Sequence, residues 1–270
     1  RHASVKGLLQ NVAEGKTDIS AAPFILPFLL SRGVGPYAKL GKDTGAEYAD
    51  RLSVLYTYRL GVFTLSAYNS SSVKGWDSLE GKTIYNGPPR GAALTNARGV
   101  VKLATGLGDG EGYTGVQVNW DQAVKTMTDG SADAFVLPSS FPDGRHTAAV
   151  ASGGITMWSM PKAAFESDAT QKYMKAPGSG RVDMPLSEAI QPEGVNVVSE
   201  DGRFRGVATV GGEVVRKDMD EELAYQLTKA VLDNLDAIKS KTPFLPQVSL
   251  GEIADTATTG MCGAMPLKYH

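Results

Sequence analysis

The sequence predicts an α/β fold with largely parallel sheets. Short apolar runs rich in β-branched and aromatic residues alternate with segments of helical period along most of the chain. The 270 residues exceed what one compact core usually needs and suit two lobes. A hydrophobic content of 42% and a charged content of 21% are typical of an ordinary globular protein.

The elements of the first half follow from apolar spacing and from glycine and proline. Ser4 is a predicted N-cap of a helix that stops at Gly15. A strand is predicted over residues 17–22, where Pro23 ends it, and one or two strands over residues 52–65. We then expect a turn or short helix at 77–81, a strand at 82–86, a loop at 87–91 and a helix at 92–105.

The alternation continues in the second half. We expect a strand at 113–118, a helix at 121–128, strands at 132–137 and 155–160, and an irregular region at 177–194. Residues 204–215 indicate a strand with a break at Gly211-Gly212. The clearest helix follows, with Asp218 as predicted N-cap and Glu221 at capping-box spacing. Its apolar residues recur at helical spacing: Leu223, Leu227, Val231, Leu232, Leu235 and Ile238.

The sequence has few of the residues that several classes of function require. The net charge is -2 with no basic block, which disfavours nucleic-acid binding. No apolar run reaches the roughly 18–20 residues of a membrane span. Cys262 is the only cysteine, and His2 and His270 sit at the chain ends. Only His146 could act as a buried base, and a surface loop after Gly144-Arg145 is expected for it. We therefore predict no catalytic residue, metal or cofactor.

The best candidate site joins the strand at 82–86 to the helix at 92–105. Its sequence is Asn86-Gly87-Pro88-Pro89-Arg90-Gly91-Ala92-Ala93-Leu94. A helix N-terminus offers backbone N–H groups and the positive end of the helix dipole to an anion. Ala92 and Ala93 allow close approach, and Arg90 offers a bidentate grip on a carboxylate. The alternative is a simple turn with Arg90 in solvent. Gly81-Lys82-Thr83 is no phosphate loop, because position 76 is Trp76.

Two other loops follow predicted strands in the same way. Asn119-Trp120 follows residues 113–118, and residues 138–142 follow residues 132–137. Trp120 and Phe141 are candidate pocket walls, and Ser139 and Ser140 are candidate hydroxyl donors. The alternative for each aromatic residue is a place in the core.

Three segments and the chain end resemble the TAXI class of solute-binding proteins, the receptors of TRAP-type transporters. Residues 79–88, Leu-Glu-Gly-Lys-Thr-Ile-Tyr-Asn-Gly-Pro, are similar to that family's "L-x-G-K-x-V-x-x-G" segment. Residues 129–135, Asp-Gly-Ser-Ala-Asp-Ala-Phe, are similar to "D-G-x-I-D-A-F". Residues 218–230 resemble the late helix "D-x-D-E-x-x-Y-x-L-T-K-A", and residues 264–267, Ala-Met-Pro-Leu, resemble "P-L-H-P-G-A" stopped early.

The resemblance implies a type II periplasmic-binding-protein fold with a hinge and a central ligand cleft. Lobe one would comprise residues 1–65 and 206–270, and lobe two residues 66–205. The protein would be a periplasmic monomer without its signal peptide. It would capture a small organic anion, expected to be a carboxylate, and deliver it to TRAP membrane subunits. The implied ligand-binding residues are Arg90, Asn86, Gly91, Ala92, Tyr58, Arg59, Trp120, Ser139, Ser140, Phe141, Ala22 and Pro23.

The chain departs from the family in two places. Members often carry Ser-Gly-Thr where this chain has Gly91-Ala92-Ala93, so two hydroxyl donors are missing and Arg90 gains importance. Members also have a first strand, a helix and a second strand before the helix that we place at Ser4. We expect either that the sequence given lacks these elements or that this chain builds its first lobe differently. Two other functions remain open: an enzyme on the same scaffold, using Ser139, Ser140 or His146, and the effector-sensing domain of a regulator.

Overall fold

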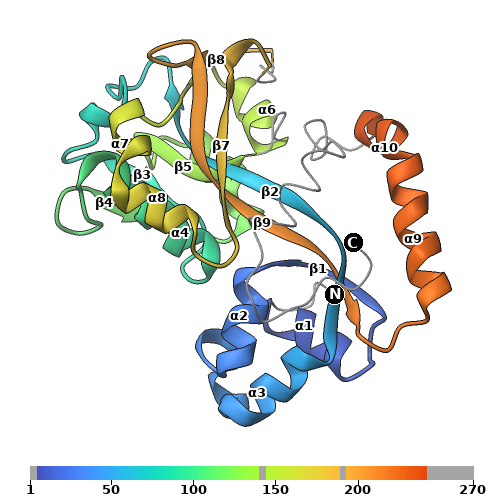
Figure 1. The fold of residues 1–270 in the computed structure, drawn as a ribbon. Coiled ribbons are helices and arrows are strands. Elements are labelled where there is room, and N and C mark those ends of the chain that lie inside the picture. The colour runs from blue at the N-terminus through green and yellow to red at the C-terminus, as the bar shows by residue number, and fades with distance from the viewer. Residues whose placement is uncertain (1–4, 140–143, 189–192, 242–270) are drawn as a thin grey trace.

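A computed structural model describes residues 5–139, 144–188 and 193–241 (Figure 1). The helices and strands are, in chain order, α1 (Val5–Ala13), β1 (Ile19–Pro23), α2 (Ile25–Arg32), α3 (Gly41–Asp50), β2 (Leu52–Tyr68), β3 (Thr83–Tyr85), α4 (Ala92–Thr105), β4 (Thr114–Val116), α5 (Ala123–Thr128), β5 (Ala134–Ser139), α6 (Gly144–Val150), β6 (Ile155–Trp158), α7 (Lys162–Glu166), α8 (Asp168–Met174), β7 (Ser179–Pro185), β8 (Val195–Val198), β9 (Arg203–Arg216), α9 (Glu221–Asp233) and α10 (Leu235–Lys241). Short 3₁₀ helices lie at η1 (Gly35–Leu40), η2 (Trp76–Ser78), η3 (Trp120–Gln122) and η4 (Leu186–Glu188).

The predicted α/β class is confirmed, but the predicted parallel character of the sheet is wrong. The strand order is β1-β9-β2-β5-β3-β4, with β6 on β2 and β8, and β7 on β9. Only the pairs β3–β4, β3–β5 and β6–β8 are parallel. The long strands β2 and β9 run antiparallel to each other and to all their other neighbours among the described strands. Both long strands are predicted, over residues 52–65 and 204–215, but their antiparallel pairing, which makes the sheet mixed, is not.

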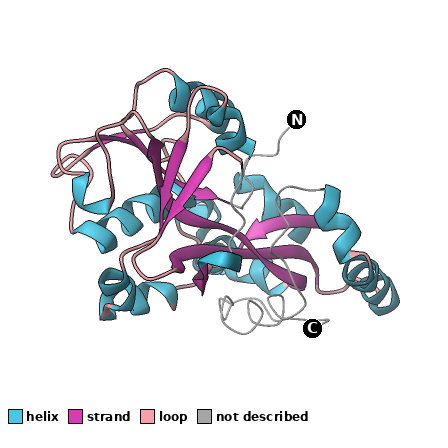
Figure 2. Ribbon diagram, turned by 90° about the horizontal axis from the view of Figure 1, so that it is seen from above, coloured by secondary structure: helices cyan, strands magenta, loops and turns pink. Residues whose placement is uncertain are grey.

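β2 and β9 link two groups of elements (Figures 1 and 2). The first half of β2 packs with α1, α2 and α3 in one core cluster, through Leu52 and Val54. The second half lies between two further clusters, with Leu65 on one face of the sheet and Val62 on the other. The register between β2 and β9 shifts between Val54 and Thr57 and again between Arg59 and Gly61. The same two strands therefore run through separate hydrophobic cores.

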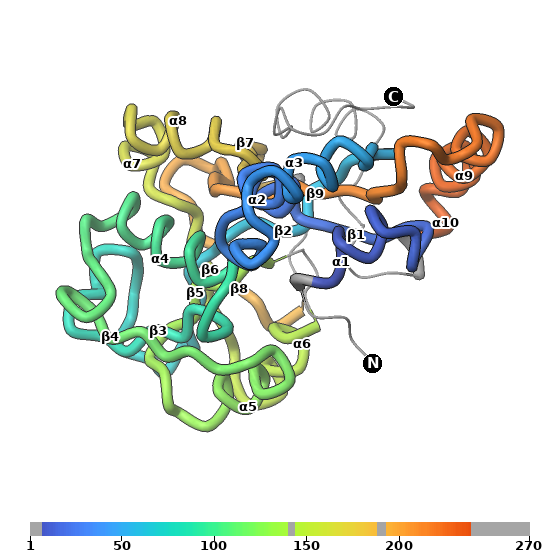
Figure 3. Tube along the Cα trace, turned by 90° about the horizontal axis from the view of Figure 1, so that it is seen from below, coloured from blue at the N-terminus to red at the C-terminus, as the bar shows by residue number. Residues whose placement is uncertain are grey.

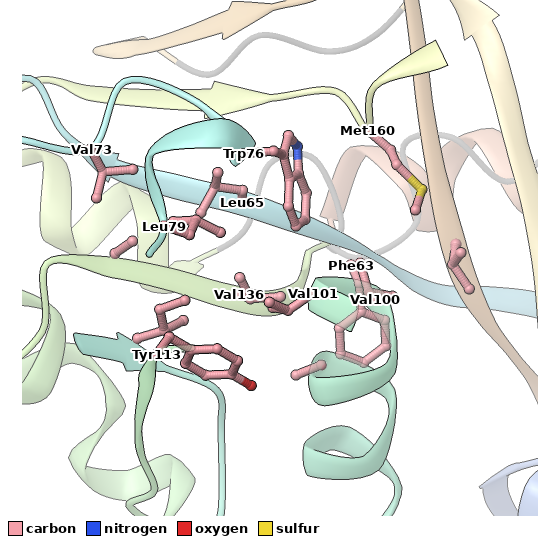
Figure 4. Packing of buried hydrophobic residues seen from close by; sticks show 14 of the residues in the cluster. Phe63, Leu65, Val73, Trp76, Leu79, Val100, Val101, Tyr113, Val136 and Met160 are labelled. Atoms are coloured by element: carbon pink, nitrogen blue, oxygen red, sulfur yellow. The ribbon is translucent and has the colours of Figure 1, made fainter. Parts of the chain in front are cut away.

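Figure 4 shows part of the cluster beneath α4, where apolar side chains from several elements interdigitate. Phe63 and Leu65 of β2 meet Val136 of β5 and Val100 of α4 there. Each fully buried side chain of this size stabilises the fold by about 1.5–3 kcal/mol. Trp76 is buried as well, and its indole N–H donates to the Ser159 carbonyl at 2.9 Å. Packing of this kind fixes the orientation of α4 on the sheet.

Three local predictions need correction. Residues 203–216 form one continuous strand, because Gly211 and Gly212 both pair with β1 and β2. The N-cap of α9 is Asp220, whose carboxylate accepts from the Leu223 N–H at 2.9 Å, and not Asp218. Part of the region expected to be irregular forms β7, paired along β9.

Candidate functional site

The connections around β3 leave the sheet on opposite faces. β3 lies between β4 and β5, parallel to both. α4 joins β3 to β4 and packs on the face that carries Ile84. η3 and α5 join β4 to β5, passing β3, and α5 packs on the face that carries Tyr85. Figure 3 shows α4 and α5 on opposite sides of these strands. In open α/β sheets, ligands bind at the carboxyl ends of strands where the connections diverge in this way.

The loop at residues 87–91 crosses this edge and is fixed at its start. The Asn86 N–H donates to the Val116 carbonyl at 3.1 Å, and the Val118 N–H donates to the Gly87 carbonyl at 3.2 Å. Gly91 is the N-cap of α4, with φ 105° and ψ -174°, a conformation open almost only to glycine. A Cβ built at Gly91 has no heavy-atom neighbour within 4 Å. The loop thus turns sharply into α4 without crowding its first turn.

The first turn of α4 presents polar backbone to its surroundings. Across the part of the chain that the structure describes, no group accepts a hydrogen bond from the N–H of Ala92, Ala93 or Leu94. Arg90 is exposed next to this turn. These donors bring positive potential to the first turn of α4, and the choice between an anion site and a simple turn with Arg90 in solvent stays open.

Asn86 is a more internal residue than its predicted role suggests. Its side chain is fully buried, and the amide oxygen accepts from Gln117 Nε2 at 2.9 Å. Gln117 Nε2 also lies 3.4 Å from an Asp109 carboxylate oxygen. Asp109 in turn accepts from the Gly115 N–H at 2.8 Å. This network ties the ends of β3 and β4 together below the loop.

Trp120 lies beside the Gly87 turn. A Cβ built at Gly87 would stand 3.5 Å from the Trp120 ring and 3.8 Å from the Ala93 Cβ, so the three residues are neighbours. The Trp120 side chain keeps 42% of its surface exposed, which places it at the edge and outside the core. The alternative weighed for this aromatic residue, a place in the core, is therefore wrong, and its role as a pocket wall stays a prediction.

Arg145 completes the cluster and was not predicted. Its guanidinium carbon lies 4.7 Å from the centre of the Trp120 ring, and its Nη2 donates to the Pro138 carbonyl at 2.5 Å. Arg145 belongs to α6, Trp120 follows β4, and Pro138 lies in β5. Burial raises the pKa of Tyr85 in β3 to about 12, while the charge of Arg145 acts to lower it and the charge of Asp121 acts to raise it. The only sequence signal was a basic residue shortly after a strand-end loop.

Of the two serine candidates, only Ser139 lies among the described residues. Ser139 is buried, and its hydroxyl accepts from Thr64 Oγ1 at 3.2 Å. It therefore binds β2 to β5, beside the pairing of Val62 with Ser139. Ser140 and Phe141 lie outside the described residues, as do the residues 264–267 that resemble the family's end.

His146 is buried in α6, so the expectation of a surface loop is wrong. Its exposed fraction is 1%, and Nε2 lies 3.0 Å from the hydroxyl oxygen of the equally buried Ser66. α6 begins at Gly144, and its buried residues are His146 and Ala149, so His146 faces inward from the first turn. The pair links α6 to β2 in the core.

The remaining candidates lie on β1 and β2, the two strands that flank β9 in the sheet. Ala22 is buried and Pro23 pairs with Gly211. Arg59 is partly buried opposite Val210. The Tyr58 hydroxyl donates to Glu213 Oε1 at 2.8 Å, and burial raises the pKa of both groups above its ordinary value. The Tyr58 hydroxyl therefore contacts β9, and the expected ligand contacts of Tyr58 and Arg59 stay predictions.

Two general features complete the description. Among the residues that the structure describes, no three His, Cys, Asp or Glu side chains are grouped so that they could hold a metal ion. In the same residues, every helix is too short or too polar to cross a membrane.

Comparison with known proteins gives one family. The model of the NMT1-like family matches residues 9–261. Among curated proteins, no sequence matches this chain significantly.

Solved structures resemble the chain weakly. The periplasmic aliphatic sulphonate binding protein SsuA of Escherichia coli is 11% identical with a TM-score of 0.45, and the match covers 93% of this chain and 65% of SsuA. The extracytoplasmic solute receptor DctP6 of Bordetella pertussis, which binds pyroglutamic acid, is 12% identical with a TM-score of 0.43, covering 99% and 74%. A TRAP periplasmic solute binding protein of Chromohalobacter salexigens is 9% identical with a TM-score of 0.44, covering 99% and 71%. The chain therefore spans just under two thirds of the length of SsuA.

Proposed function

Since the chain belongs to the NMT1-like family, we propose that it is an extracytoplasmic solute-binding protein that captures a small organic anion. The anionic group is a carboxylate in this proposal, and no bond is made or broken. The observation that carries the proposal is the first turn of α4, where three backbone N–H groups and Arg90 lie together at the diverging edge of β3.

Ligand contacts in this proposal come mainly from backbone and arginine. Gly91 and Ala92 contribute backbone N–H groups, and Arg90 contributes charge. Positions 91–93 of the sequence carry no hydroxyl side chain. The ligand's anionic group is therefore recognised by Arg90 and backbone N–H groups and not by hydroxyl donors of the protein. Trp120, partly exposed beside Gly87, supplies an apolar wall.

The second part of the proposal concerns motion. Residues 1–65 with 206–270 form one lobe, residues 66–205 form the other, and the lobes close on the ligand. Two features support a division into lobes, although Val62 and Leu65, at the end of the first segment, pack in the clusters of the second lobe. β2 and β9 run through separate hydrophobic clusters, and their mutual register is irregular between Arg59 and Gly61. In hinge closure, a few residues between the lobes absorb the change in backbone conformation.

The partner in this proposal is the membrane part of a TRAP-type transporter, and the protein acts as a monomer in the periplasm. The TAXI-like segments support it. The segment at residues 129–135 also has a structural purpose here. Asp133 accepts from the Thr83 N–H at 2.8 Å, which joins β5 to the start of β3.

Binding of an organic acid is the direct test. Protein purified without refolding is examined by native mass spectrometry for a bound compound, and calorimetry then measures pyruvate, succinate, L-glutamate, benzoate and methanesulfonate, with benzamide and succinamide as uncharged partners. We expect at least one acid to bind, with its amide much weaker. Binding of neutral compounds alone, or turnover of the bound compound, would overturn the proposal.

A further inference from the structure

Helix α9 carries more apolar surface than the sheet beside it covers. Of the residues in α9, all of them described, only Ala224 is buried, and it packs with Leu55 of β2 and Val215 of β9. Leu223 and Leu227 keep 50% and 37% of their surfaces exposed. Four residues apart, these two side chains lie on one line along the helix. We call them the leucine stripe.

The leucine stripe is distinct from the polar face of α9. Gln226 Nε2 donates to Glu222 Oε1 at 2.6 Å, and Lys229 pairs with Asp233. At about 100° per residue, these four side chains share one face, and the leucine stripe lies between that face and the buried one. An apolar stripe next to the buried face is typical of a helix that has a second packing partner.

Strand β1 exposes apolar side chains on the same side of the sheet. Ile19 lies directly opposite Val215, and directly opposite residues of antiparallel strands point to one face. Val215 packs with Ala224, so Ile19 lies on the face that α9 covers, called here the α9 face. Ile19 keeps 43% of its surface exposed, and Ala21, two residues further on, is exposed as well. Among the described strands β1 ends the order, so one of its edges has no described strand beside it.

The two faces of this part of the sheet differ in how they are covered. On the opposite face, Val54 and Val214 pack with α1, α2 and α3 in one large cluster. On the α9 face, the described residues form small clusters around Leu55 and around Leu235. A sheet with apolar side chains on both faces is normally covered on both. The leucine stripe and Ile19 thus mark a face that the described elements cover incompletely.

We propose that residues 242–270 of this chain pack on the α9 face, against the leucine stripe and Ile19. These residues follow α10, whose first residue, Leu235, packs with Tyr56 and Tyr58 of β2 on the same side of the sheet. The described chain therefore ends beside the surface that it would cover. The inference does not depend on the proposed binding function.

The length and composition of residues 242–270 suit this place. A helix of 13 residues is about 20 Å long, and an extended chain spans about 3.3 Å per residue, so about six or seven residues suffice to run back along α9. Apolar side chains recur early in the segment, at Phe244, Leu245, Val248, Leu250 and Ile253. They are the partners that an apolar stripe requires.

Photo-crosslinking in the full chain tests the contact directly. The probe p-benzoylphenylalanine replaces Leu227, or Tyr225 in the matched control. Tyr225 lies on the same helix with 55% of its surface exposed, and at about 100° per residue it projects away from the leucine stripe. Peptide mass spectrometry after irradiation identifies the crosslinked residues.

We expect the probe at position 227 to crosslink to residues 242–270 of its own chain, and the probe at position 225 to do so with a yield about tenfold lower, since it faces elsewhere. Crosslinks between two molecules would make a second copy of the chain the occupant and overturn the inference. A yield to residues 242–270 that is equal for the two probes, or absent for both, would overturn it too.

Hydrogen exchange gives an independent measurement on the full chain. Leu227→Asp places a charge in the proposed contact, and Tyr225→Asp is the control; circular dichroism verifies that both are folded. We expect Leu227→Asp to raise the exchange rates of amides in residues 242–270 by about tenfold or more, and Tyr225→Asp to leave them unchanged. Equal rates in wild type and Leu227→Asp would contradict the proposal. If Leu227→Asp does not fold, Leu227→Ala, which removes apolar surface without adding charge, takes its place.

Discussion

Two arginines lie near the diverging edge of the sheet, and the fold holds them differently. Arg90 is exposed in the loop before α4, whereas Arg145 stacks on Trp120 and donates to Pro138. An exposed side chain loses rotamer entropy when a ligand orders it, at a cost of about 0.5–1.5 kcal/mol. Arg145 has already lost much of that freedom. Arg90 should therefore lose this entropy when it binds a ligand.

Replacing Arg90 tests the loop directly. We expect Arg90→Ala to weaken binding of the acid by about tenfold, because one charge-assisted contact is lost and the backbone donors of α4 remain. Calorimetry measures the change, with Arg32→Ala, at the C-terminal end of α2, as control. Equal affinities of Arg90→Ala and wild type would remove Arg90 from the site.

Glu213 should make the stability of the protein depend on pH. Burial raises the pKa of its carboxyl above the ordinary 4.5, and the hydrogen bond from Tyr58 offsets this only in part. A group whose pKa is higher in the folded state contributes stability below its unfolded pKa and loses that contribution as pH rises through the folded pKa.

The free energy of unfolding of wild type should therefore fall relative to Glu213→Gln as pH rises from about 4.5. Glutamine keeps an acceptor for Tyr58 and cannot ionise. Urea unfolding of both proteins in steps of pH gives the difference. If the unfolding free energy of wild type minus that of Glu213→Gln stays constant or rises over this pH interval, burial does not destabilise the ionised carboxylate of Glu213.

Among the secondary-structure elements, the N-terminus of α9 gives the clearest comparison between the predicted and the observed cap. Asp220 caps α9 through the Leu223 N–H, whereas Asp218 pairs with Arg216 at 2.8 Å on the surface. Both residues suit a cap by type, and only the structure distinguishes them. Loss of an N-cap costs about 1 kcal/mol, and an exposed ion pair contributes less.

Asp220→Ala should lower the free energy of unfolding by about 1 kcal/mol, and Asp218→Ala should lower it by clearly less. Urea denaturation followed by circular dichroism measures both. The reverse order would return the cap to Asp218, where the sequence alone places it.

Local sequence patterns predicted some elements correctly and gave no indication of others. α4 has both predicted ends, because its apolar stripe and Gly106, a left-handed C-cap, are local features. α2 was missed because Pro27 suggests a break, yet it occupies the first turn, where no N–H is required. The loop before α4 was predicted from its own residues. Arg145 was not, since its contact with Trp120 joins distant parts of the chain.

At the scale of the molecule, the proposed division into lobes predicts a change of shape. If the lobes close on the ligand, the radius of gyration in solution should fall when a bound acid is added. Small-angle X-ray scattering with and without the acid measures this, and the matching amide is the control. An unchanged radius at saturation would mean that the protein binds without closing.

The pairing of β1 with β9 also bears on the order in which the chain acquires structure. β1 is made early, and its partner among the described strands is made near the end. The cluster that holds α1, α2 and α3 likewise includes Val210 and Val214 of β9. Contacts between distant segments form slowly, and a growing chain cannot form them before both segments exist. The earliest helices therefore complete their packing last, after the middle of the chain has had time to fold, and delayed synthesis of β9 would leave their apolar faces open to aggregation.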